Sequence, residues 1–225
     1  MEDGELKHTM IFIFLIMLMV GCGKTNETDD QRFLKTIVYN NGRVGEKNTG
    51  EAKKHSAWIE GNELMVSDGG NTYAHKEYEY SDDGYVLVSF YDELKGFLLY
   101  CSDPGCGMMT KLLYETDDGG KTLSEKKDLS ESVEGYPTDI FFDDEKTGYV
   151  TVSYHGGEYF VYCLIDGECI GLKPESIPDG CRYIDGNRFY KEDEKTLLEC
   201  TAVFENYEEK VIYNISGKSV KLYTP

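Results

Sequence analysis

The stretch VSDGGNTYAH, residues 66–75, recurs as TDDGGKTLSE at residues 116–125, and this recurrence decides the expected fold. The two copies lie 50 positions apart. Degraded copies follow in CLIDGECIGL around Asp166 and in YNISGKSVKL around Ser216. A period of this size predicts a repeat architecture with one supersecondary unit per repeat.

The segments between these turns repeat as well. Short runs rich in Val, Ile, Tyr and Phe are separated by Gly or Asp turns, as expected for strands. The runs directly before the turns read ELMVS, KLLYET, EYFVYCLI and KVIYNI. No long stretch after the N-terminal region has a helical period. The sequence therefore predicts an all-β fold in which a four-stranded antiparallel meander repeats radially, a β-propeller of about four blades.

The two best turns resemble the Asp-box, or bacterial neuraminidase repeat, of pattern Ser/Thr-x-Asp-x-Gly-x-Thr-aromatic. The matching residues are Asp68, Gly70, Thr72 and Tyr73 in the first turn, and Thr116, Asp118, Gly120 and Thr122 in the second. Val66 and Leu123 depart from the pattern. The resemblance covers roughly residues 33–225 but is strong only at these turns. It implies that each box closes the hairpin between the third and fourth strands of a blade. Its residues would be structural and lie away from any active site.

The N-terminal region is typical of an exported protein. An apolar run from Met10 to Val20 has the length of a signal-peptide core and is too short to span a bilayer. It ends in Gly21-Cys22, which resembles a bacterial lipobox. We expect residues 1–21 to be a lipoprotein signal peptide, and Cys22 to carry a lipid that anchors the protein to the extracytoplasmic face of the bacterial membrane. An uncleaved anchor is the alternative. Residues 22–32 would be a flexible tether to a domain at 33–225.

The first residues do not fit an export signal. Glu2, Asp3 and Glu5 outweigh Lys7, whereas such a signal begins with net positive charge. A translation start near Leu6 is therefore our hypothesis.

The chain has 7 cysteines, and an even number remains if Cys22 is lipidated. In an exported protein these six are disulfide candidates. Sequence proximity suggests the pairs Cys101–Cys106, Cys163–Cys169 and Cys181–Cys200. Fifteen connectivities are possible for six cysteines. A zinc site is the rival interpretation, but no CxxC pair occurs and the 4 His are scattered. We expect no metal and no cofactor.

Charge and missing motifs exclude several functions. The formal net charge of -19 argues against nucleic-acid binding, because the surface repels phosphates. The Asp-box also resembles the repeat of sialidases, which bind their acidic sugar with three arginines. This chain has only Arg32, Arg43, Arg182 and Arg188, and it lacks the Arg-Ile-Pro signature. No nucleophile elbow, P-loop or dinucleotide fingerprint is present, so no catalytic residue is predicted.

Two further features have open interpretations. The acidic runs lack the alternation of a calcium loop and are expected to be solvated turns; they lie at Asp82-Asp83, Asp117-Asp118, Asp143-Asp144 and Glu192-Asp193-Glu194. Trp58, with His55 nearby, is either a stacking platform for a ligand or a packing residue between blades.

These observations predict a non-enzymatic cell-surface lipoprotein whose propeller scaffold binds an unknown protein or glycan partner. The alternative is a degenerate glycoside-hydrolase-type enzyme related to sialidases. That alternative requires two or three carboxylates that converge, one of them with a raised pKa.

Overall fold

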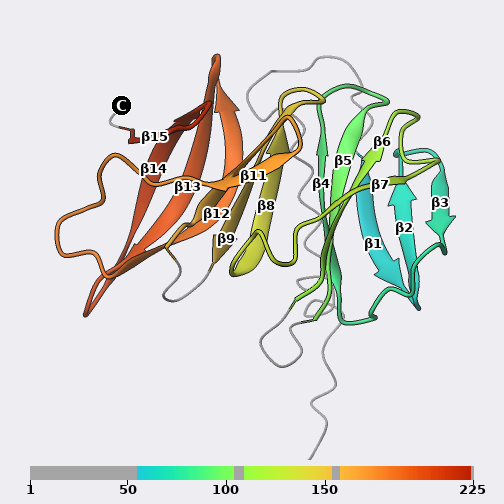
Figure 1. The fold of residues 1–225 in the computed structure, drawn as a ribbon, viewed down its shortest axis with the longest axis horizontal. Coiled ribbons are helices and arrows are strands. Elements are labelled where there is room, and N and C mark those ends of the chain that lie inside the picture. Colours follow the sequence, from blue (N-terminus) through green and yellow to red (C-terminus); the bar gives the residue numbers. More distant parts are fainter. Residues whose placement is uncertain (1–54, 104–108, 154–157, 224–225) are drawn as a thin grey trace, which may run out of the picture. The chain divides into compact units, whose positions relative to one another are not determined.

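The computed structural model of the chain describes residues 55–103, 109–153 and 158–223, and within these ranges it is all-β (Figure 1). Its strands form four separate antiparallel sheets, and no helix occurs in the described ranges. The predicted signal peptide, Cys22 and the predicted tether all lie outside the described residues. No helix in the described ranges is long and apolar enough to cross a membrane.

Each sheet is a simple meander in which neighbouring strands are also consecutive in the chain. The first sheet contains β1 (Ser56–Glu60), β2 (Glu63–Ser67) and β3 (Thr72–His75). The second contains β4 (Tyr85–Phe90), β5 (Gly96–Cys101), β6 (Lys111–Thr116) and β7 (Ser124–Asp128). The third contains β8 (Tyr136–Phe142), β9 (Thr147–Ser153), β10 (Val161–Ile165) and β11 (Glu168–Gly171). The fourth contains β12 (Tyr183–Glu192), β13 (Lys195–Val203), β14 (Glu208–Ser216) and β15 (Ser219–Leu222).

The repeated antiparallel meander predicted from the sequence is thus confirmed at the level of the sheets, although the first sheet has three strands within the described residues where four were predicted. Every predicted Val-, Ile- and Tyr-rich run forms a strand, and each box-like turn joins the last two strands of its sheet. Only β1, with sequence SAWIE, was not predicted as a strand.

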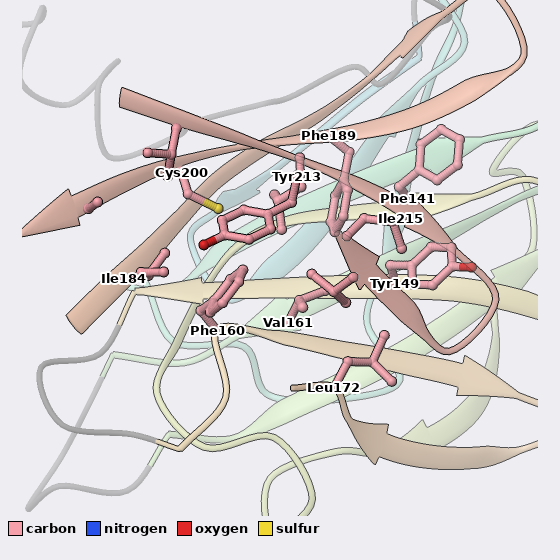
Figure 2. Close-up of a cluster of buried hydrophobic side chains, with 14 of the residues drawn as sticks. Phe141, Tyr149, Phe160, Val161, Leu172, Ile184, Phe189, Cys200, Tyr213 and Ile215 are labelled. Atoms are coloured by element: carbon pink, nitrogen blue, oxygen red, sulfur yellow. The ribbon is translucent and has the colours of Figure 1, made fainter. Parts of the chain in front are cut away.

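In the second sheet, β4, β5 and β6 are largely buried on both faces, which explains their apolar sequences, whereas the edge strand β7 is mostly exposed. In β5, sequence GFLLYC, every residue is buried. Successive strand side chains point to opposite faces. Leu98 and Tyr100 accordingly join a cluster shared with the first sheet, while Phe97 and Leu99 join a cluster shared with the third. A third cluster lies between the third and fourth sheets (Figure 2).

The fourth sheet, in contrast, is apolar on one face only. In β13, Leu198 and Cys200 face the cluster in Figure 2, where Phe160 and Tyr213 bring their ring centroids to 5.2 Å. The intervening Glu199 is on the other face and binds Arg188 at 3.2 Å and Lys210 at 3.0 Å. This alternation is typical of a half-buried antiparallel sheet.

Contacts between different sheets follow chain order in Figure 1. Strand β1 packs on β4, β4 and β5 pack on β8, and β8 and β9 pack on β12. No comparable contact joins the first sheet to the fourth among the described residues, so the sheets are not closed into a ring.

Hydrogen bonds between sheets recur with the same period as the turns. In β4, Ser89 Oγ accepts a hydrogen bond from the backbone N of Phe142 in β8 at 2.8 Å. In β8, Asp139 Oδ2 accepts one from the backbone N of Phe189 in β12 at 2.7 Å. Ser89 and Asp139 are 50 positions apart. The repeat therefore extends from the strands to the contacts between successive sheets.

Candidate binding groove

The first box-like turn is held together by the carboxylate of Asp68. Its Oδ1 accepts hydrogen bonds from the backbone N of Gly70 at 2.8 Å and of Asn71 at 2.7 Å. Its Oδ2 accepts one from the Tyr73 hydroxyl at 3.1 Å. The backbone donors of Asn71 and Gly70 lower the pKa of Asp68 well below its usual range. Thr72, the remaining residue of this motif, begins β3 and pairs with Ser67.

The second turn uses Asp118 in the same way. Asp118 Oδ1 accepts a hydrogen bond from the backbone N of Thr122 at 2.9 Å, and its Oδ2 accepts one from the Thr122 hydroxyl at 2.8 Å. The Thr116 hydroxyl binds Asp118 at 3.1 Å and accepts from the backbone N of Gly120 at 2.9 Å. Burial alone would raise the pKa of Asp118, but the hydrogen bonds from Thr122 and Thr116 lower it. The first glycine of each turn sequence also has a structural role, because Gly69, Gly119, Gly167 and Gly217 all adopt positive φ.

Side chains from the preceding sheet bind three of these turns. His75 Nε2 lies 2.9 Å from the carbonyl oxygen of Gly120, the Lys127 ammonium donates to the carbonyl of Gly167 at 2.5 Å, and the Tyr149 hydroxyl donates to the carbonyl of Gly217 at 3.2 Å. The box-like residues therefore close hairpins and dock successive sheets.

The five described cysteines are free thiols: Cys101, Cys163, Cys169, Cys181 and Cys200. Cys106 lies outside the described residues, so its predicted bond with Cys101 is not described.

The structure does not contain the other two predicted disulfides. Cys163 pairs with Ile170 and joins one cluster, whereas Cys169 pairs with Leu164 and packs against another, so the two thiols lie on opposite faces of the third sheet.

Cys181 and Cys200 are separated along the strands. The register places Cys200 opposite Gly186, five residues beyond Cys181. That spacing corresponds to roughly 15 Å of extended strand, which exceeds the Cα separation of a disulfide.

The remaining candidate residues are dispersed. Trp58 lies on the face of the first sheet away from its cluster and donates to Glu60 at 3.4 Å, while the His55 ring stacks on Phe90 at 3.8 Å. They do not form a joint platform. Arg188 binds Glu199, and Arg182 is exposed ahead of β12. Arg32 and Arg43 lie outside the described residues.

The acidic runs occupy connections between strands, as the sequence predicts for Asp82-Asp83 and for Asp143-Asp144. Asp144 Oδ1 accepts hydrogen bonds from the backbone N of Lys146 and of Thr147, both at 2.7 Å, which closes the turn between β8 and β9. No group of three His, Cys, Asp or Glu suited to a metal ion occurs within the described ranges.

The structure instead reveals a groove at the opposite end of the second sheet from its box-like turn. The groove encloses about 1020 Å³ and lies where β5 ends, β6 begins and β7 ends. The connection from β7 to β8, residues 129–135, forms one wall. Exposed aromatic rings of Tyr78 and Tyr136 contribute to the lining. This volume is at the upper end of the range for ligand pockets.

Lys111 is the unusual residue of this groove. The residue as a whole is 4% exposed, and its ammonium, which is not a fully buried atom, has no hydrogen bond or ion pair with any described residue. Burial lowers the pKa of Lys111, while the nearby Cys101 and Asp128 oppose that shift. Lysine is rarely buried without a partner, because losing hydration disfavours the charged form. The Lys111 ammonium is therefore suited to bind a hydrogen-bond acceptor supplied by a ligand.

The backbone around Lys111 is fixed by the wall of the groove. Its N–H donates to Ser130 Oγ at 2.9 Å, and its carbonyl accepts from the backbone N of Leu129 at 2.8 Å. Ser130 in turn donates to Asp128 Oδ1 through its backbone N at 2.8 Å and its hydroxyl at 2.5 Å. These hydrogen bonds from Ser130 lower the pKa of Asp128. Lys111 is therefore positioned by rigid strands and a tight turn.

Exposed carboxylates line the groove around this lysine, and they come from separate parts of the chain. They belong to Asp103, Asp128, Glu131 and Glu134. Sequence analysis missed the groove, because only the strand register brings Asp128 beside Lys111. The one available signal was the lysine at the start of the otherwise apolar run KLLYET.

Comparisons with known proteins identify no family. No protein-family model matches this chain, and no curated protein matches it.

Proposed function

We propose that this protein is a non-enzymatic binding protein, anchored by lipid to the extracytoplasmic face of a bacterial membrane, that holds a protein or glycan partner in the groove above β6. In this proposal the four sheets are blades of an open, propeller-like array of the Asp-box type. The observation that carries the proposal is Lys111, a residue that is 4% exposed and whose ammonium has no hydrogen bond or ion pair with a described residue, in a groove with exposed tyrosines and carboxylates.

The position of the groove supports this assignment. At one end of the sheet, the polar groups of the box-like turn between β6 and β7 form hydrogen bonds with one another. In an antiparallel meander, the connections from β5 to β6 and from β7 to β8 lie at the other end. Connections carried by a rigid scaffold are frequent binding sites.

A hydrolase is the second candidate, since the groove contains several carboxylates. A general acid in a glycosidase needs a raised pKa. The pKa of Asp128 is instead lowered by Ser130, which favours binding over acid catalysis at this residue. Turnover of aryl glycosides, including a sialoside, by the purified protein would support the hydrolase, and we expect none.

Filling the groove tests the binding proposal. Ser132 is exposed in its wall, so Ser132→Trp should obstruct a partner without disturbing the cores. Lys121→Trp adds the same bulk at the exposed box-like turn and serves as the control. Chemical cross-linking on intact cells should give a partner adduct with the wild type and Lys121→Trp but not with Ser132→Trp. An adduct that persists in Ser132→Trp would overturn the proposal.

A further inference from the structure

We propose that the ligand of the groove is a basic peptide segment of a protein partner, whose main-chain carbonyl or terminal carboxylate binds Lys111 while its Lys or Arg side chains meet the surrounding acids. This inference rests on the proposed function and narrows its partner from protein or glycan to a cationic polypeptide.

Charge in the groove favours a cationic ligand. Four carboxylates line it, from Asp103, Asp128, Glu131 and Glu134, against the single ammonium of Lys111. A neutral saccharide would leave these charges uncompensated as it displaced their water. Lysine and arginine side chains would pair with them. The formal net charge of -19 also attracts a basic partner from a distance at low salt.

Lys111 distinguishes the groove from an ordinary acidic surface. Its ammonium lines the groove, and no described residue supplies a hydrogen-bond acceptor for it. A peptide main chain carries a carbonyl at every residue, and a C-terminus adds a carboxylate. A polyamine or a simple metal cation offers no such acceptor. The buried lysine therefore favours a polypeptide among cationic ligands.

The exposed tyrosines fit the same ligand. Tyr78 is 39% exposed and Tyr136 is 43% exposed, and both line the groove. Aromatic faces bind ammonium and guanidinium groups and pack against the aliphatic stems of Lys and Arg. The groove volume of about 1020 Å³ is suited to several residues of an extended segment.

Binding of defined probes to the purified protein tests this inference. The probes are a capped peptide of alternating glycine and lysine, the matching peptide of alternating glycine and glutamate, and the neutral tetrasaccharide chitotetraose. Titration calorimetry at low and high salt gives each Kd. We expect binding of the lysine peptide, weakened by salt, and no binding of the other two.

Matched variants separate the groove from the overall charge. Glu131→Gln/Glu134→Gln removes two groove carboxylates, whereas Glu205→Gln/Glu209→Gln removes two exposed carboxylates of the fourth sheet. The groove variant should raise the Kd of the lysine peptide about tenfold, and the control variant less than about twofold. Lys111→Met, which keeps most of the apolar stem, should raise it about tenfold as well.

The outcomes distinguish the two proposals. If chitotetraose binds and the groove variants abolish its binding, the peptide inference fails but the groove remains a binding site. If both double variants weaken the lysine peptide equally, its binding is general charge attraction and the inference fails. If no probe binds, the inference fails, and the proposed function then depends on the cross-linking result for Ser132→Trp. Unchanged affinity in a folded Lys111→Met variant would also overturn the inference.

Discussion

Asp139 in β8 and Phe189 in β12 connect the third sheet to the fourth. The Asp139 side chain is fully buried, and its Oδ2 accepts a hydrogen bond from the backbone N of Phe189 at 2.7 Å. Its Oδ1 accepts one from the backbone N of Ile140 at 2.9 Å. A side chain therefore satisfies two buried main-chain donors, one of them in the next sheet.

Replacing this carboxylate should destabilise the protein strongly. Asp139→Ala leaves both N–H groups buried without their acceptor, and we expect a loss of about 3 kcal/mol in the free energy of unfolding. Ser89→Ala removes the corresponding acceptor between the second and third sheets and should cost about 1 kcal/mol. Urea denaturation of each variant provides the measurement. Equal, small losses for both would show that Asp139 does not connect the sheets.

Gly120 is expected to tolerate no side chain. It has φ +88°, and a Cβ there would lie 2.4 Å from Val66 Cγ1 in the first sheet. Gly120→Ala should therefore lower stability by about 3 kcal/mol, which combines backbone strain with a steric clash. Gly217 has φ +56°, and a Cβ there would meet open space, so Gly217→Ala should lower stability by only about 1 kcal/mol. Thermal unfolding of the two variants should differ in this order; the reverse order would contradict the contact with Val66.

Acid should weaken the box-like turns. The hydrogen bonds to Asp118 lower its pKa in the folded state, so its ionised form stabilises the protein above the unfolded pKa of about 4. This contribution is lost as the pH falls through the folded pKa. Asp118→Asn should be about 1 kcal/mol less stable than the wild type near neutral pH, and the difference should shrink as the pH falls below about 4.

The neighbouring Asp117 is the control for this pH dependence. It is exposed, and its carboxylate has no hydrogen bond within the described residues, so Asp117→Asn should match the wild type throughout. A stability difference for Asp118→Asn that stays constant with pH would contradict the role of the ionised carboxylate.

The buried thiols should be unreactive in the folded protein. Burial raises the pKa of Cys101 to about 12, and it also raises the pKa of Cys163 and of Cys200. Because thiolates are the reactive form, we expect these residues to resist alkylation until urea unfolds the protein. Peptide mapping after alkylation without reductant should then find all three modified. Modification that requires a reductant would demonstrate disulfides instead.

Sequence reasoning predicted the strands and turns because both are local. The residues of KLLYET themselves favour a β-strand, and Asp118 accepts hydrogen bonds from donors within four residues of itself. It also predicted the meander, since the turns recur at a fixed interval. Strand β1 was missed because its short sequence SAWIE mixes polar and apolar residues without a repeated partner.

The groove and the free thiols depend on the pairing register of the strands, which the sequence alone does not reveal. Cys163 and Cys169 are close in the chain but face opposite sides of the third sheet. Lys111 reads as the polar start of an apolar strand. Only the pairing of β6 with β5 and β7 buries it and places it among side chains from three connections.

Site-specific photo-cross-linking on intact cells tests the central claim most directly, namely that the partner binds at the groove and not at the box-like turns. A photoreactive residue would replace Glu131 in the groove or, in a second variant, Lys121 at the turn. The proposed function predicts a discrete partner adduct from position 131 and none from position 121. Adducts from position 121 alone, or of equal yield from both positions, would contradict it.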